Sequence, residues 1–108
     1  ELCIDFTYIL IYTDCMVFEW DPVKDRINMA KHDISFSDAC NAFLDPGRLI
    51  YKDLVHSTRE ERFFCYGRIG NKVCTVRFTV RGNAIRIFGA GFWREGAKIY
   101  EAQQKDTI

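Results

Sequence analysis

The sequence predicts a small α+β domain, in which helices pack on one face of an antiparallel sheet. The 108 residues suit one domain. Up to Gly47 the apolar residues recur mainly at helical spacing, and after it they alternate with a period of two. Gly-Asn pairs at 70–71 and 82–83 separate the alternating segments, as hairpin turns do. We therefore expect a strand and two helices, followed by a run of antiparallel strands.

The chain opens with an apolar segment, Leu2–Tyr12. It is too short to cross a bilayer as a helix, which needs about 20 residues, and it lacks the basic flank of a secretory signal. Met16 is followed at once by a short strand-like run. We therefore expect residues 1–15 to be an N-terminal extension and residues 16–108 to form the domain. An additional strand within residues 1–15 is the alternative.

Two helices are predicted after this strand. The first, Pro22–His32, follows a good N-cap, Asp21, and has proline at its first position. The second, from about Phe36 to Leu44, follows Ser35 and is ended by Asp-Pro-Gly at 45–47. The first helix is expected to bury one narrow apolar stripe, formed by Val23, Ile27 and Ala30.

The second half is predicted to hold four strands and a closing helix. The strands are expected at Arg48–Leu54, Glu61–Ile69, Lys72–Arg81 and Ala84–Gly89, and the helix at Trp93–Gln104. The predicted order of the domain is therefore β-α-α-β-β-β-β-α.

Alternation in Lys72–Arg81 separates an apolar face from a basic one. The apolar set, expected to face the helices, is Cys74, Val76, Phe78 and Val80, and the opposite set is Thr75, Arg77, Thr79 and Arg81. Arg86 follows the second turn and is expected beside Arg81. Guanidinium groups match phosphate geometry and aromatic rings stack on bases, so such a face fits RNA. The alternative is an ordinary solvated face of an antiparallel sheet.

The formal net charge is zero, but the charges are unevenly distributed. Residues 1–47 carry three basic and nine acidic groups, and residues 48–108 carry twelve basic and six acidic ones. This asymmetry favours an anionic partner for the second half. Pairing between the two halves in the folded chain is the alternative.

The most concentrated polar stretch runs from His56 to Arg62. His56, Glu60 and Arg62 together offer a base, an acid and a charge clamp for phosphoryl transfer. RNA cleavage by the neighbouring 2′-hydroxyl needs only these functions and no metal ion. The alternative is a polar loop with weak surface ion pairs. The basic pair Lys31-His32 has a structural explanation, because cations are stabilised at helix C-termini.

The cysteines do not form a metal-binding or disulfide pattern. Their number is odd, no C-x-x-C spacing occurs, and no histidine lies at ligand spacing. We therefore expect no metal and no cofactor, and reduced thiols in a cytoplasmic protein. The five are Cys3, Cys15, Cys40, Cys65 and Cys74.

Short motifs run in a fixed order from Met16 to Glu101. They are Phe18-Glu19-Trp20-Asp21-Pro22, Lys24, Asn28, Lys31-His32, Ser35-Phe36, Asp45-Pro46, His56-Ser57, Glu60-Glu61-Arg62, Phe78-Thr79-x-Arg81, Ile85-Arg86-Ile87, Arg94, Glu95 and Tyr100-Glu101. In this order they resemble the BrnT toxins of type II toxin–antitoxin systems.

The resemblance implies a RelE-like fold and metal-independent RNA cleavage that arrests translation. It also implies a BrnA-like antitoxin that inhibits the toxin and through which the complex binds DNA; no membrane partner is implied. The catalytic positions are expected to be His56, Glu60, Arg62, Arg81 and Arg86, and the RNA-binding positions Lys31, His32, Arg77 and Arg94.

Two departures from the family pattern stand out. Asp33 occupies a helix C-cap position where the family usually has glycine, and aspartate tolerates the left-handed backbone needed there. Residues 88–93 replace a Ser-Ala-Arg type of segment, so an arginine of some relatives is missing. The alternatives to an active ribonuclease are a catalytically weak module that mainly complexes an antitoxin, and an unrelated scaffold whose arginines keep it soluble.

Overall fold

The computed structural model describes residues 9–13 and 16–106 and has the predicted α+β class. Its elements are β1 (Ile9–Thr13), β2 (Met16–Trp20), α1 (Pro22–His32), α2 (Phe36–Ala39), the 3-10 helix η1 (Cys40–Leu44), β3 (Leu49–Lys52), β4 (Arg62–Ile69), β5 (Lys72–Arg81), β6 (Ala84–Gly91) and α3 (Arg94–Asp106). The predicted order lacked β1 and η1.

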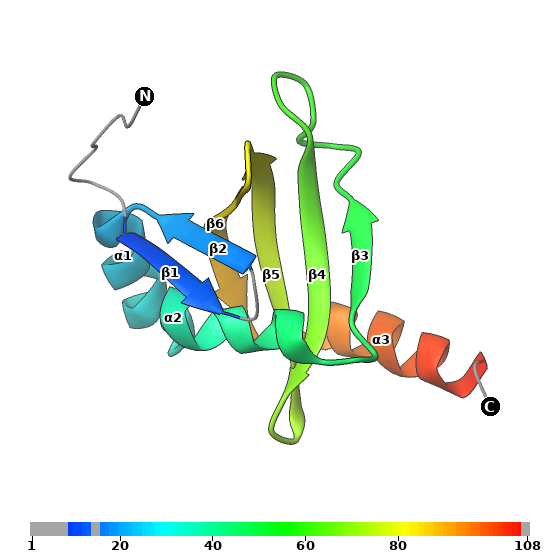
Figure 1. Cartoon of the computed structure of the whole chain (residues 1–108). Helices are drawn as coiled ribbons and strands as arrows, with labels where there is room; N and C mark the ends of the chain where they lie inside the picture. The colour runs from blue at the N-terminus through cyan, green and yellow to red at the C-terminus, as the bar shows by residue number, and fades with distance from the viewer. Residues whose placement is uncertain (1–8, 14–15, 107–108) are drawn as a thin grey trace.

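In the described part of the chain, six strands form one mixed sheet in the order β1-β2-β6-β5-β4-β3 (Figure 1). The prediction of an antiparallel sheet is wrong at one place, because β2 pairs with β6 in parallel. The chain leaves β2, passes through the helices and the β3–β6 meander, and returns to the side of β2 in the same direction. The hairpin turns are confirmed, since Gly70 and Gly82 have φ of +63° and +58°.

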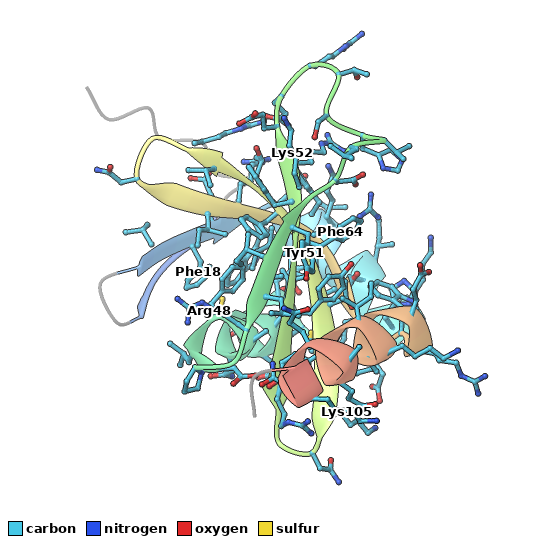
Figure 2. The ribbon with its side chains drawn as sticks, turned by 90° about the vertical axis from the view of Figure 1, so that its right-hand side faces the viewer. Phe18, Arg48, Tyr51, Lys52, Phe64 and Lys105 are labelled. Carbon is cyan, nitrogen blue, oxygen red and sulfur yellow. The ribbon has the colours of Figure 1, made fainter. Side chains whose placement is uncertain are left out.

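The prediction that the helices share one face of the sheet is also wrong. Helices α2 and η1 pack on the face that carries Cys65 and Val76. Helix α3 packs on the opposite face, where Tyr66 and Val73 meet its Tyr100. Figure 1 shows α2 in front of the sheet and α3 behind it, and Figure 2, seen from the β3 side, places Phe18 and Phe64 on opposite sides of the strands.

The apolar face predicted for β5 is confirmed at three of its four positions. Cys74, Val76 and Phe78 are buried in the main core. Val80 is 54% exposed, because it lies at the hairpin end of β5, close to Gly82 and outside the core cluster.

Helix α1 docks through a polar side chain. The predicted apolar stripe is wrong, since Val23 and Ile27 are half-exposed and Ala30 is exposed. The buried residue of α1 is Asn28, whose side-chain amide donates to the carbonyl oxygens of Ile34 and Ala90 and accepts from the Ala90 N–H. The two bonds with Ala90, at 2.9 and 3.2 Å, tie α1 to the backbone of β6, and the bond to Ile34, at 3.1 Å, ties it to the segment before α2.

The ends of the helices follow the predicted caps. Asp21 accepts a hydrogen bond from the Val23 N–H, and Ser35 accepts one from the Asp38 N–H. Asp33 adopts the left-handed conformation expected of it, with φ 58° and ψ 37°. The predicted second helix is divided, with α2 continuing as η1.

The N-terminal segment contributes one described strand. Residues 9–13 form β1, which pairs antiparallel with β2. Residues 1–8 and 14–15, and with them Cys3 and Cys15, lie outside the described part of the chain. Cys40, Cys65 and Cys74 are free and buried, and burial raises the pKa of each thiol to about 12. Among the described helices, none has the length and apolar character that crossing a membrane requires.

Candidate active site

The loop between β3 and β4 is closed at its base by hydrogen bonds. The Asp53 N–H donates to the Arg62 carbonyl at 2.7 Å. The Ser57 hydroxyl accepts from the Arg62 N–H at 3.0 Å and donates to the Asp53 carbonyl. These bonds fix both ends of the loop, so the polar residues between them are held at one end of the sheet.

His56 is oriented by a buried carboxylate. Asp53 is only 5% exposed, and its Oδ2 lies 3.0 Å from Nδ1 of the His56 ring. Its Oδ1 accepts from the N–H groups of Val55 and His56. Because an ionised carboxylate only accepts hydrogen bonds, Nδ1 carries the proton in the neutral ring, and Nε2 keeps its lone pair.

Burial alone would raise the pKa of the Asp53 carboxyl. The hydrogen bonds from His56, the charge of that ring and the Val55 N–H outweigh burial, so the pKa lies below its ordinary value. Asp53 therefore stabilises the fold fully above the unfolded pKa of about 3.9, and this contribution is lost as the pH falls through the lower folded value.

We expect Asp53→Asn to weaken the dependence of thermal stability on acid pH. The melting temperature of the parent should fall between pH 5 and pH 3, and that of the variant should fall less, because the variant has no carboxylate to protonate at this position. Thermal unfolding at pH 3, 5 and 7 measures this. Asp38→Asn, on the exposed side of α2, is the control and should follow the parent. Equal slopes for Asp53→Asn and the parent would contradict the expectation.

Two arginines converge on Glu60 beside this histidine. The Glu60 carboxylate lies 3.6 Å from Nη2 of Arg62 and 3.3 Å from Nη2 of Arg81. The Arg62 guanidinium also lies over the ring of Phe88, 4.3 Å from its centroid, which holds its plane by a cation–π contact. The result is a pair of guanidinium groups held by one carboxylate and one ring.

The histidine, the glutamate and the two arginines line one pocket of about 530 Å³. Its walls are formed by Val55, His56, Thr58, Arg59, Glu60, Arg62 and Arg81. The structure thus brings together four of the five residues that the sequence predicted as catalytic. A histidine with a free ring nitrogen and two guanidinium groups can deprotonate a hydroxyl beside a bound phosphate.

Arg86, the fifth, is placed elsewhere. It is 7% exposed, its Nη1 lies 3.2 Å from Oε2 of Glu19, and it does not line the pocket. The parallel pairing of β2 with β6 sets these two residues opposite each other.

The four predicted RNA-binding residues lie outside the pocket. Arg77 is half-buried and pairs in register with Phe64, on the same face of the sheet as Arg62. Lys31 is exposed at the end of α1, and the ring of its neighbour His32 lies 5.0 Å from that of Trp93. Arg94 is exposed at the start of α3.

Asp53 and Phe88 are the site residues that sequence reasoning missed. The Asp-x-x-His spacing at 53–56 is the one sequence signal for the first, and it is short and common. Nothing local predicts that Phe88 supports Arg62, because the contact joins two strands that are not neighbours in the sheet. Among the described residues, no group of three or more histidine, cysteine or acidic side chains could hold a metal ion.

A family model described as "Ribonuclease toxin, BrnT, of type II toxin-antitoxin system" matches residues 20–95. The chain belongs to the BrnT family. The matched range contains Asp53 and every residue that lines the pocket. As a type II toxin family, BrnT implies ribonuclease activity and an antitoxin partner. No curated protein matches the chain.

Proposed function

We propose that this BrnT-family protein is a cytoplasmic, metal-independent endoribonuclease that arrests translation by cutting RNA in the pocket at the end of β4 and β5. A cognate BrnA-like antitoxin neutralises it, and DNA is bound only through that antitoxin. The likeness to the RelE-like toxins, expected from the sequence, is part of this proposal. The observation that supports it most is the Asp53–His56 contact beside two arginines.

In the proposed reaction His56 is the general base. Its Nε2 takes the proton of an RNA 2′-hydroxyl, and the resulting oxygen attacks the adjacent phosphorus. The bond from phosphorus to the 5′-oxygen breaks, and that oxygen takes a proton from solvent. The products are a 2′,3′-cyclic phosphate and a 5′-hydroxyl end.

Arg62 and Arg81 stabilise the charge of the pentacoordinate phosphorus. Both are half-exposed at the pocket, so a phosphate can reach their guanidinium groups. Glu60 holds these two groups in place in the free protein. The positive charge that a metal ion would bring is thus supplied by side chains.

The test is incubation of the purified, antitoxin-free chain with single-stranded RNA in the presence of EDTA. We expect cleavage with 2′,3′-cyclic phosphate ends, read by end-group analysis and gel electrophoresis. RNA that stays intact, or that is cut only after Mg²⁺ is added, would contradict the proposal.

A second candidate is a catalytically weak module that acts mainly by complexing its antitoxin. Exposed apolar side chains on the edge strand β3 and the loop after it favour a protein contact there. They are Ile50, Tyr51, Leu54 and Val55, the last two 83% and 76% exposed. Intact RNA together with tight binding of the antitoxin would favour this candidate.

A further inference from the structure

A second hollow lies on the same face of the sheet, where the start of α3 meets β4 and β5. Its volume is about 240 Å³, and it is lined by Phe64, Tyr66, Thr75, Trp93, Glu95 and Gly96. We propose that this hollow binds a guanine base of the RNA that is cut in the neighbouring pocket. The inference rests on the proposed function and adds a base-recognition site to it.

The hollow continues the surface of the catalytic pocket along β4. Arg62 lines that pocket, and Phe64, two residues further on the same face, lines the hollow. At roughly 3.3 Å per residue, Arg62 and Tyr66 are separated by about 13 Å along the strand. An RNA strand bound at the arginines can therefore place a nearby base in the hollow.

Aromatic rings make the hollow suitable for a base. Phe64 and Tyr66 are stacked, with centroids 5.9 Å apart and an interplanar angle of 16°. Trp93 is 37% exposed, and its ring lies so close to Gly91 that a Cβ there would be 2.7 Å from Cζ2. The ring is thus held in place before any ligand binds. Base stacking on aromatic side chains stabilises single-stranded RNA complexes by about 1–3 kcal/mol per base.

Size and close packing restrict the hollow to a small ligand. Its volume is below the roughly 300 Å³ at which pockets for drug-sized ligands begin, which suits one ring system. Gly96 lets α3 approach the sheet here, since a Cβ at this position would lie 2.1 Å from Oγ1 of Thr75 and 3.0 Å from the Tyr66 ring. The Thr75 hydroxyl is buried beneath Gly96 and has no hydrogen-bond partner in the described part of the chain.

Glu95 selects the kind of base. A carboxylate repels phosphate and offers only acceptors, so it pairs with a base edge that has two adjacent N–H donors. Guanine has such an edge, with N1–H and the N2 amino group, and adenine does not. Glu95 and Tyr66 both line the hollow, and the pKa of Tyr66 is raised first by burial and then by the nearby charge of Glu95. No ion pair of Glu95 is present among the described residues.

The test is a titration of the full chain, labelled with ¹⁵N, with GMP and with AMP. The chain has two tryptophans, and the buried Trp20 serves as an internal reference for the indole signal of Trp93. We expect GMP to shift the Trp93 signal at lower concentration than AMP. Glu95→Gln should weaken GMP binding by about tenfold and remove the preference over AMP.

Glu101→Gln is the matched control, because it makes the same change on α3 outside the hollow. Equal shifts with GMP and AMP, or a Glu95→Gln variant that binds GMP as the parent does, would overturn the inference. Neither readout depends on cleavage. If RNA stays intact while GMP still binds at Trp93, only the proposed function fails; if RNA is cut and GMP does not bind, only the guanine site fails.

Discussion

Replacing His56 with alanine is expected to slow RNA cleavage by about 10²- to 10⁴-fold, the range that general acid–base catalysis contributes. The His56 side chain is 56% exposed and makes its contact through Nδ1 to Asp53, so the fold should survive its removal. The measurement is the initial cleavage rate of single-stranded RNA, with growth on expression in cells as a second readout.

Asp53→Asn tests how much the orientation of the His56 ring matters while the base itself, His56, is kept. An asparagine at this position can donate to Nδ1 and so favours the tautomer with the proton on Nε2, which cannot accept the 2′-hydroxyl proton. We expect a large loss of rate with His56 still in place. Asp38→Asn should cleave as the parent does. A His56→Ala variant that cleaves RNA and arrests growth as fully as the parent would show that the base is a different group.

The second large effect is expected at Arg81. Arg81→Ala should lower the cleavage rate by about 10²- to 10³-fold, the loss typical when one donor to a developing charge is removed. Arg81→Lys should recover only part of this rate, because lysine keeps the charge but lacks the planar fork that binds two phosphate oxygens. Single-turnover rates at saturating RNA measure the effect on the chemical step.

Arg26→Ala is the matched control for Arg81. Arg26 is exposed on α1 and does not line the pocket, so its removal should leave the rate unchanged. Equal losses in the two variants would mean that RNA responds only to overall charge. In that case the arginine pair would have no special role.

The local patterns of the sequence predicted those features that depend on neighbours in the chain. The alternating pattern of β5 predicted that Cys74 and Val76 lie on the buried face and Arg77 and Arg81 on the other, because successive side chains of a strand point to opposite faces. The helix caps and the hairpin turns also depend on neighbouring residues and were predicted for the same reason. The left-handed conformation of Asp33 is one example. The polar stretch His56–Arg62 lies at the pocket, because most of the polar side chains that line the pocket belong to one short loop.

Features that depend on distant pairing were missed. The parallel pairing of β2 with β6 has no local signal, and it is this pairing that buries Arg86 against Glu19. The packing of α2 and α3 on opposite faces of the sheet likewise depends on contacts between residues far apart in the chain. The stripe at Val23 and Ile27 looked like a buried face, but α1 docks through Asn28 instead.

The uneven charge of the two halves is only partly cancelled by folding. Arg86 pairs with Glu19 across the halves. Arg62 and Arg81 pair instead with Glu60, which belongs to their own half. The basic surface near the pocket is therefore formed by the second half, as an anionic partner would require.

The position of Glu60 between the two arginines also affects which anions can bind in the pocket. A carboxylate tethered between two guanidinium groups competes with any incoming anion at high effective concentration. Inorganic phosphate must displace the Glu60 carboxylate with only the contacts that one small ion can make. An RNA strand adds base stacking and further ionic contacts along the sheet. We therefore expect the pocket to tolerate the small phosphates of the cell and still bind a polymer.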